Sequence, residues 1–302
     1  MTTLATGRDA RSAHLTGIAL MLAGVVMFSF GDALGKYLVG SYSVGQLLLL
    51  RALAALILIA PFVWRARAEF RQIPRPGLQF LRVMLSASEV AAFFVATVYL
   101  PLADVITFYM AGPIFVTALS AIFLGEKVGW RRWSAVAIGF CGVLIALNPS
   151  SQTMSWPALI ALGGSFSFAV LMVVTRFLRG TSDMVLASSQ FVASLMFGAV
   201  MAPFGWVAPS MRDLTLFLVA GGISVSALLC VNRSLKLAAA SVVVPYQYTM
   251  IVWASIFGYI VFGDVPSYNI VIGALIIAAA GLYIFVRESR LARERPPGMP
   301  PA

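Results

Sequence analysis

Residues 99–149 read YLPLADVITFYMAGPIFVTALSAIFLGEKVGWRRWSAVAIGFCGVLIALNP, which is two apolar segments on either side of a charged turn. The segments cover residues 103–124 and 131–148, and each is close to the ~20 apolar residues that an α-helix needs to cross a bilayer. Both are continuous apolar runs, whereas the strands of a membrane barrel alternate apolar and polar side chains. The stretch therefore predicts two membrane-spanning helices that are joined by a short basic loop.

Apolar segments of the same kind fill the rest of the chain. Hydrophobic residues make up 61% of it and charged residues only 11%, against about 25% charged residues in a soluble domain. One soluble core cannot bury this much apolar surface, so we expect an all-α integral membrane protein. Ten transmembrane helices are predicted at residues 14–38, 43–64, 77–99, 103–124, 131–148, 156–178, 184–204, 213–236, 239–262 and 268–286.

The second half of the chain repeats the first at an offset of about 138 residues. Residues 28–30 (FSF) return as residues 166–168, and residues 123–126 (FLGE) are matched by residues 261–264 (VFGD). Each copy holds five predicted spans, and this odd number makes the second copy enter the membrane from the opposite side. Such inverted repeats are typical of transporters, which bind substrate near the midplane between the halves.

The basic residues lie mainly in short loops on one predicted side of the membrane. The loop at 65–76 alone holds Arg65, Arg67, Arg71 and Arg75. This bias predicts that both termini are cytoplasmic, and it explains the net charge of +10 without a nucleic-acid partner. The expected organisation is a cytoplasmic N-terminal tail, two five-helix repeats and a cytoplasmic C-terminal tail, at residues 1–13, 14–148, 156–286 and 287–302.

Residues 99–149 also resemble the signature region of the EamA type of the drug/metabolite transporter superfamily. The matching features are a polar start at residues 102–104, Pro113 within the helix, Gly125-Glu126 at its end, and a following helix that carries glycines. The second copy has its helical proline at Pro245, earlier than the position equivalent to Pro113. The resemblance implies a ten-helix transporter of the bacterial inner membrane. In length and span number the chain is similar to amino-acid exporters, including the aromatic amino-acid exporter, while related members take up vitamins or nucleoside-like metabolites.

Ionisable residues inside a membrane are costly and each needs a reason. Asp32 and Lys36 lie one turn apart on the first helix, and Arg51 lies on the second. They form either a structural ion-pair network or an outer gate on the substrate path. The equivalent residues of the second copy, Val170, Val174 and roughly Gln190, are uncharged, so the fold does not require the charges, which favours the functional interpretation.

Glu89 lies near the middle of the third helix, on the same face as Ser86 and Arg82. A midplane carboxyl group can bind a substrate ammonium group, carry a proton, or hydrogen-bond to a neighbouring helix in its protonated form. Arg82 lies near the inner end, where its long side chain can snorkel to the interface.

A mixture of aromatic and amide side chains follows Pro245, where the missing backbone donor loosens the helix. We expect Tyr246, Gln247 and Trp253, with Tyr109 from the fourth helix, to line the substrate site, since rings and a few hydrogen bonds suit an amphipathic organic molecule. Aromatic residues are also common at membrane interfaces, so a purely structural role is the alternative.

The leading functional prediction is a secondary transporter that exports amino acids, aromatic or otherwise amphipathic, by alternating access. The alternative is an importer of a vitamin or nucleoside-like metabolite. The sequence has no phosphate-binding loop, and one histidine and two separated cysteines form no metal site, so no cofactor is expected. An enzyme would need paired acids or a metal site at a membrane boundary. A channel would need a ring of pore-lining polar groups. Neither pattern is visible in the sequence, so a transporter is preferred to both classes. The predicted partners are a small-molecule substrate and the lipid bilayer.

Overall fold

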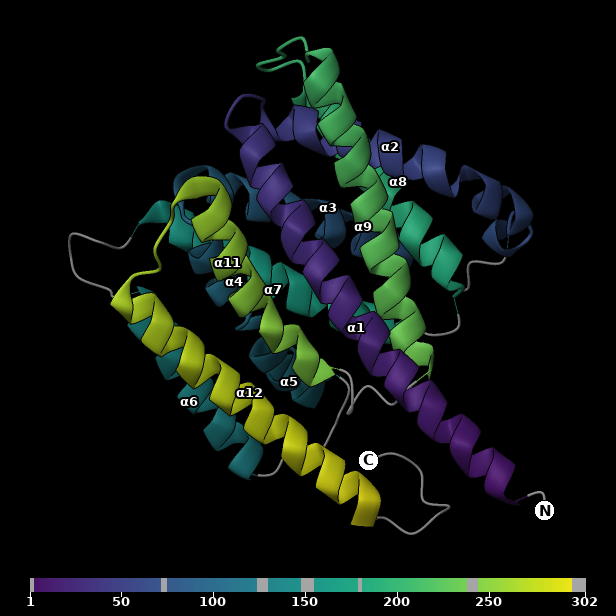
Figure 1. Cartoon of the computed structure of the whole chain (residues 1–302), viewed down its shortest axis with the longest axis vertical. Coiled ribbons are helices and arrows are strands. Elements are labelled where there is room, and N and C mark those ends of the chain that lie inside the picture. The colour runs from purple at the N-terminus through teal and green to yellow at the C-terminus, as the bar shows by residue number, and fades with distance from the viewer. Residues whose placement is uncertain are drawn as a thin grey trace.

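A computed structural model describes residues 3–71, 75–123, 130–147, 155–178, 181–237 and 244–294 of the chain. All regular structure in these residues is helical (Figure 1). The α-helices are α1 (Thr3–Val39), α2 (Val44–Arg65), α3 (Pro76–Tyr99), α4 (Leu102–Tyr109), α5 (Gly112–Phe123), α6 (Trp130–Leu147), α7 (Trp156–Phe177), α8 (Asp183–Met201), α9 (Met211–Leu237), α11 (Met250–Phe262) and α12 (Tyr268–Glu294). Two short 3-10 helices are η1 (Glu69–Arg71) and η2 (Val244–Thr249).

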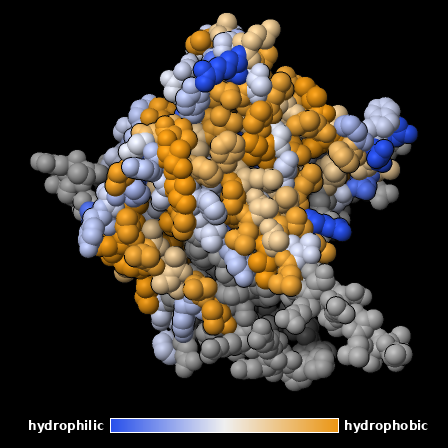
Figure 2. All heavy atoms as spheres, in the orientation of Figure 1, coloured by the Kyte–Doolittle hydropathy of each residue, from blue (hydrophilic) through white to orange (hydrophobic). Residues whose placement is uncertain are grey.

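These elements make the ten expected helical segments, because α4 with α5 and η2 with α11 each occupy one predicted span. Within the described residues, six helices are long and apolar enough to cross a membrane, and three shorter apolar helices include α11 and the first part of α12. Many large apolar side chains point outward: Ile57, Phe80 and Leu275 are all more than half exposed. Figure 2 shows hydrophobic side chains over much of one face, with hydrophilic patches toward its edges. This surface suits lipid as its solvent.

Two helix ends differ from the prediction. α1 begins at Thr3 and α12 ends at Glu294, so each helix is longer than the predicted span, at 14–38 and 268–286. Residues 287–294 contain neither proline nor glycine, so nothing in the local sequence ends the helix where its apolar stretch ends.

The helices of the two halves pack against one another rather than forming separate bundles. Numbering the ten segments in order, the first (α1) packs on the eighth (α9) and the third (α3) on the sixth (α7). Exchanging the two halves interchanges these two contacts. The same exchange maps the pair α2–α8 and the pair α6–α12 onto themselves, and Figure 1 shows α1 beside α9 and α6 beside α12. This pairing is what duplicated, interlocked halves produce.

The predicted helix at residues 103–124 is broken at Met110 and Ala111, between α4 and α5. Pro113 has no backbone N–H, so the carbonyl of Tyr109 four residues earlier loses its helical donor. The hydroxyl of Ser165 on α7 donates to this carbonyl instead, at 3.4 Å. The break thus fastens the fourth span of the first half to the first helix of the second half.

Candidate functional site

Three ionisable side chains, one from each of the first three helices, lie close enough to interact electrostatically; Asp32 is buried and the other two are partly buried. Arg51 on α2 interacts electrostatically with both Asp32 on α1 and Glu89 on α3, and we call these three residues the central cluster. The Nε atom of Arg51 donates to the hydroxyl of Ser224 on α9 at 2.7 Å. The second half of the chain therefore contributes directly to the cluster, as a site between two halves requires.

The surroundings of the central cluster are close-packed and apolar on one side. The guanidinium carbon of Arg51 lies 5.1 Å from the ring centroid of Phe94, within the range of a cation–π contact. Phe94 reaches this position because it lies directly against Gly35 of α1, where the Cβ of any other residue would overlap the ring. Side-chain packing thus holds the guanidinium in place from α3 as well as from α9.

Several polar atoms beside the central cluster have no hydrogen-bond partner among the described residues. They are Nη1 of Arg51 and the hydroxyls of Ser29 and Ser86. Ser29 lies three residues before Asp32, and Ser86 three before Glu89, so each hydroxyl shares a helix face with a carboxyl group. A buried polar group without a partner costs about 1–3 kcal/mol. These three atoms are available to hydrogen-bond with a ligand or with water.

Tyr109, a predicted contact residue, lies next to this cluster. Its hydroxyl donates to the backbone carbonyl of Glu89 at 3.0 Å, and its ring makes an edge contact with Phe93 at 5.2 Å. The hydroxyl also lies directly against Gly164 of α7, where a Cβ would collide with it. Tyr109 therefore joins α3, α4 and α7 beside the central cluster.

Lys36 belongs to a different group of charges. Its Nζ lies 2.6 Å from Oδ2 of Asp264 and 4.5 Å from the ring centroid of Phe262. Asp104 at the start of α4 interacts electrostatically with both Lys36 and Asp264. The predicted network of Asp32, Lys36 and Arg51 is therefore divided in the structure. Asp32 and Arg51 belong with Glu89, whereas Lys36 pairs with Asp264 of the second half.

We call Lys36, Asp104 and Asp264 the end cluster, because they lie where α11 turns into α12. Gly263 makes that turn with φ of 70°, a left-handed conformation that favours glycine. Neither Asp104 nor Asp264 was predicted from the sequence as a site residue. The available clue was the repeated motif of a glycine followed by an acid, at 125–126 and 263–264.

The aromatic residues after Pro245 pack toward α1. Tyr246 and Trp253 contact an apolar cluster that contains Met21 and Val25. Trp253 also stacks on Phe257, with centroids 6.3 Å apart. Gln247, the third residue predicted here, is half-buried on η2. The described contacts of Tyr246 and Trp253 are thus with apolar side chains, which supplies an aromatic wall rather than a polar one.

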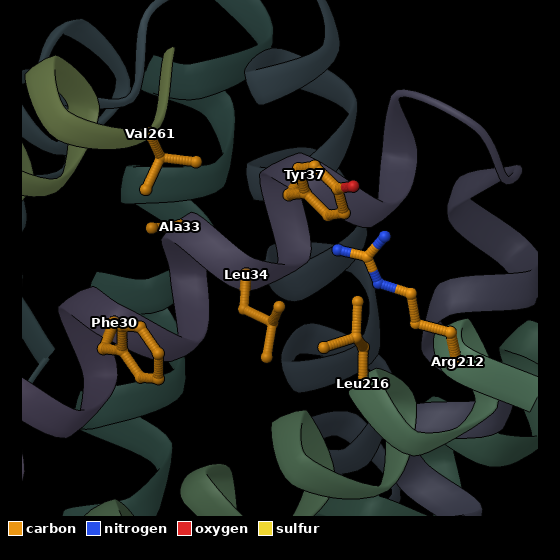
Figure 3. A pocket seen from close by; sticks show the side chains of 7 residues that line it. All are labelled: Phe30, Ala33, Leu34, Tyr37, Arg212, Leu216 and Val261. Carbon is orange, nitrogen blue, oxygen red and sulfur yellow. The ribbon is translucent and has the colours of Figure 1, made fainter.

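The described pockets do not contain the central cluster. One, of about 200 Å³, lies between α1, α9 and α11, and apolar side chains such as Phe30 and Leu34 line most of it (Figure 3). Another, of about 710 Å³, lies between α2, α3 and α8 and is lined by residues such as Leu56 and Trp64. Neither of these two pockets is lined by Asp32, Arg51 or Glu89, of which Asp32 is buried and the other two are partly exposed.

Arg82 corrects one expectation. It was expected to snorkel, but it is only 6% exposed. Its Nε donates to the hydroxyl of Thr175 at 3.0 Å and its Nη1 to the backbone carbonyl of Leu186 at 3.0 Å. The acceptors come from α7 and α8, so Arg82 ties α3 to the second half instead of reaching for the interface.

Interlocked helical halves around a buried charged cluster define a polytopic membrane transporter. The sequence matches the model of the EamA-like transporter family twice, over residues 15–148 and 155–286. The chain belongs to this family, whose members are transporters and not enzymes.

Two curated relatives and one solved structure extend this comparison. The S-adenosylmethionine uptake transporter of Rickettsia felis is 26% identical over 285 residues, which cover 93% of this chain and 96% of the relative. The riboflavin transporter of Rhizobium johnstonii is 28% identical over 245 residues, 80% of each chain. A crystal structure with 17% sequence identity superposes with a TM-score of 0.62 and covers 93% of this chain and 99% of its own, which shows the same fold. The predicted superfamily is confirmed, but the names of these relatives do not support an amino-acid exporter in particular.

Proposed function

We propose that this protein is a secondary transporter that imports a nucleoside-like or vitamin metabolite across the bacterial inner membrane. The observation that carries the proposal is the central cluster, which brings together α1, α2, α3 and α9 around polar atoms that have no hydrogen-bond partner among the described residues. Charged groups inside a membrane protein mark substrate or ion pathways by default. The names of the two curated relatives support this class of substrate.

The proposed mechanism is alternating access between two inverted halves, with both termini in the cytoplasm. The odd number of spans in each half and the arginine-rich loops support this orientation. In that topology the end cluster faces the outside. We propose that the Lys36–Asp264 pair, which joins the first half to the second, is then the outer gate in its closed state.

Export of amino acids remains a second candidate, because the central cluster contains groups of both charge signs and a zwitterion needs both. Tyr109, Tyr246, Gln247 and Trp253 would then surround the side chain of the amino acid. The two candidate functions differ in the substrate and in the direction of transport, and they share the same fold.

Counterflow in proteoliposomes tests the proposal. Purified protein is reconstituted with an unlabelled compound inside, and entry of the labelled compound is followed for S-adenosylmethionine, riboflavin and aromatic amino acids in turn. We expect saturable counterflow with a nucleoside-like or vitamin compound. Counterflow with amino acids alone would favour the second candidate, and none with any compound of the panel would refute the proposal.

A further inference from the structure

The central cluster has the chemistry to recognise one particular group on a substrate. We propose that it binds the α-amino-acid group of a cationic nucleoside conjugate, with the substrate carboxylate on Arg51 and its ammonium group on Asp32 and Glu89. This inference rests on the proposed function and narrows its substrate class. It separates the two relatives, since S-adenosylmethionine carries such a group and riboflavin does not.

Arg51 is the receptor for the carboxylate. Its Nε is occupied by Ser224, while Nη1 is buried and has no partner in the described part of the protein. A guanidinium group presents its donors as a planar fork that matches a carboxylate. Phe94 lies against the guanidinium group on one side, and the free donor remains available for an acceptor.

Asp32 and Glu89 are the receptors for the ammonium group. Both interact electrostatically with the same guanidinium, so the cluster holds two carboxyl groups for one base. Ser29 and Ser86, each fully buried and unpartnered, lie on the same helix faces as these carboxyl groups. A hydroxyl can accept a hydrogen bond from an ammonium group or donate one to a carboxylate. The orphaned hydroxyls therefore complete a site for both ends of an amino acid.

The charge balance favours a substrate with an additional positive charge. Binding of the ammonium group requires ionised carboxyl groups, and with both ionised the central cluster carries one net negative charge. An amino-acid group adds one charge of each sign and leaves this excess unchanged. A sulfonium or similar cation attached to the amino acid offsets it, whereas a neutral flavin offsets nothing and leaves Arg51 Nη1 without a partner.

The test compares ligands that differ by one group. Uptake of labelled S-adenosylmethionine into proteoliposomes is measured in competition with three unlabelled compounds: S-adenosylmethionine itself, its decarboxylated form, and 5′-methylthioadenosine, which lacks the whole amino-acid group. For the wild-type protein we expect the decarboxylated form to compete about tenfold less well or worse, since a charge-assisted pair is lost. Methylthioadenosine is expected to compete still less.

Variants then test whether Arg51 is the residue that distinguishes S-adenosylmethionine from its decarboxylated form. In Arg51→Gln the ratio between S-adenosylmethionine and its decarboxylated form should fall close to one, whatever the absolute rate. Arg51→Lys retains the charge and should keep part of the ratio. Arg212→Gln, which removes an exposed arginine remote in role from the cluster, should leave the ratio unchanged. Because the wild-type comparison needs no variant, the proposal stays testable even where Arg51→Gln fails to fold.

The outcomes separate this inference from the proposed function. Equal competition by all three compounds in the wild type overturns the inference and leaves import of a nucleoside-like compound standing. Saturable riboflavin transport that is unchanged in Arg51→Gln would also overturn the inference and leave the proposed import function standing. Absence of transport for S-adenosylmethionine and riboflavin alike overturns both.

Discussion

Removing the charge of Lys36 should open the outer end of the transporter. Lys36 Nζ and Asp264 Oδ2 are 2.6 Å apart, and their side chains are 13% and 26% exposed. Hydrogen bonds to charged groups contribute about 1.5–3 kcal/mol, and each 1.4 kcal/mol is a factor of ten in an equilibrium constant. If the pair forms only when this end is closed, Lys36→Gln shifts the equilibrium toward the open form by about 10- to 100-fold.

Labelling of a buried cysteine measures this shift. Ser29 is fully buried beside the central cluster, so a Ser29→Cys thiol, with Cys141 and Cys230 replaced by serine, reacts with an impermeant reagent only after the end opens. Lys36→Gln should raise the labelling rate from the outside by at least about tenfold.

Two further variants control this experiment. The exchange of Lys36→Asp with Asp264→Lys restores a pair of opposite charges and should return labelling toward the rate of the parent protein. Arg212→Gln removes another cation on the α9 side of the 200 Å³ pocket and should not change it. Unaltered labelling in Lys36→Gln, or equally fast labelling in the exchanged pair, would refute the gate.

Three other predictions concern the site and the topology. Glu89→Gln keeps the shape of the side chain but removes one carboxyl group from Arg51, and we expect transport to fall at least tenfold with normal expression; transport at the parent rate at every pH would contradict a role in substrate or proton handling. Ala at Tyr246 or Trp253 removes an aromatic wall against α1 and should raise the half-saturation concentration several-fold in uptake assays, as loss of one ring contact of about 1 kcal/mol does; normal kinetics in both variants would exclude these residues from the site. A cysteine in place of Arg67, which follows α2, should be labelled only after the membrane is permeabilised, and labelling in intact cells would reverse the topology.

Local sequence was sufficient to predict the helices and their number. Apolar runs of about 20 residues have few alternatives in lipid, because every backbone polar group must be bonded within the segment. The repeat at 28–30 and 166–168 predicted two related halves, and the pairing of α1 with α9 and α3 with α7 agrees with this. The break at Met110–Ala111 was not predicted. Pro113, which helps to cause it, is visible in the sequence, but the hydrogen bond from Ser165 on another helix to the freed carbonyl of Tyr109 is not.

Which charges meet was decided by tertiary structure alone. Lys36 lies one turn from Asp32 on the same helix, yet it pairs with Asp264, 228 residues away. Asp32 joins Glu89 through Arg51 instead. Helical spacing specifies which side chains share a face, but partners across helices depend on how the faces are packed together. Here that packing is set by small residues such as Gly35 and Gly164, which admit Phe94 and Tyr109 between helices. The sequence thus determined a duplicated membrane protein with buried charges, and only the packing of its two halves sorted those charges into a central cluster and an end cluster.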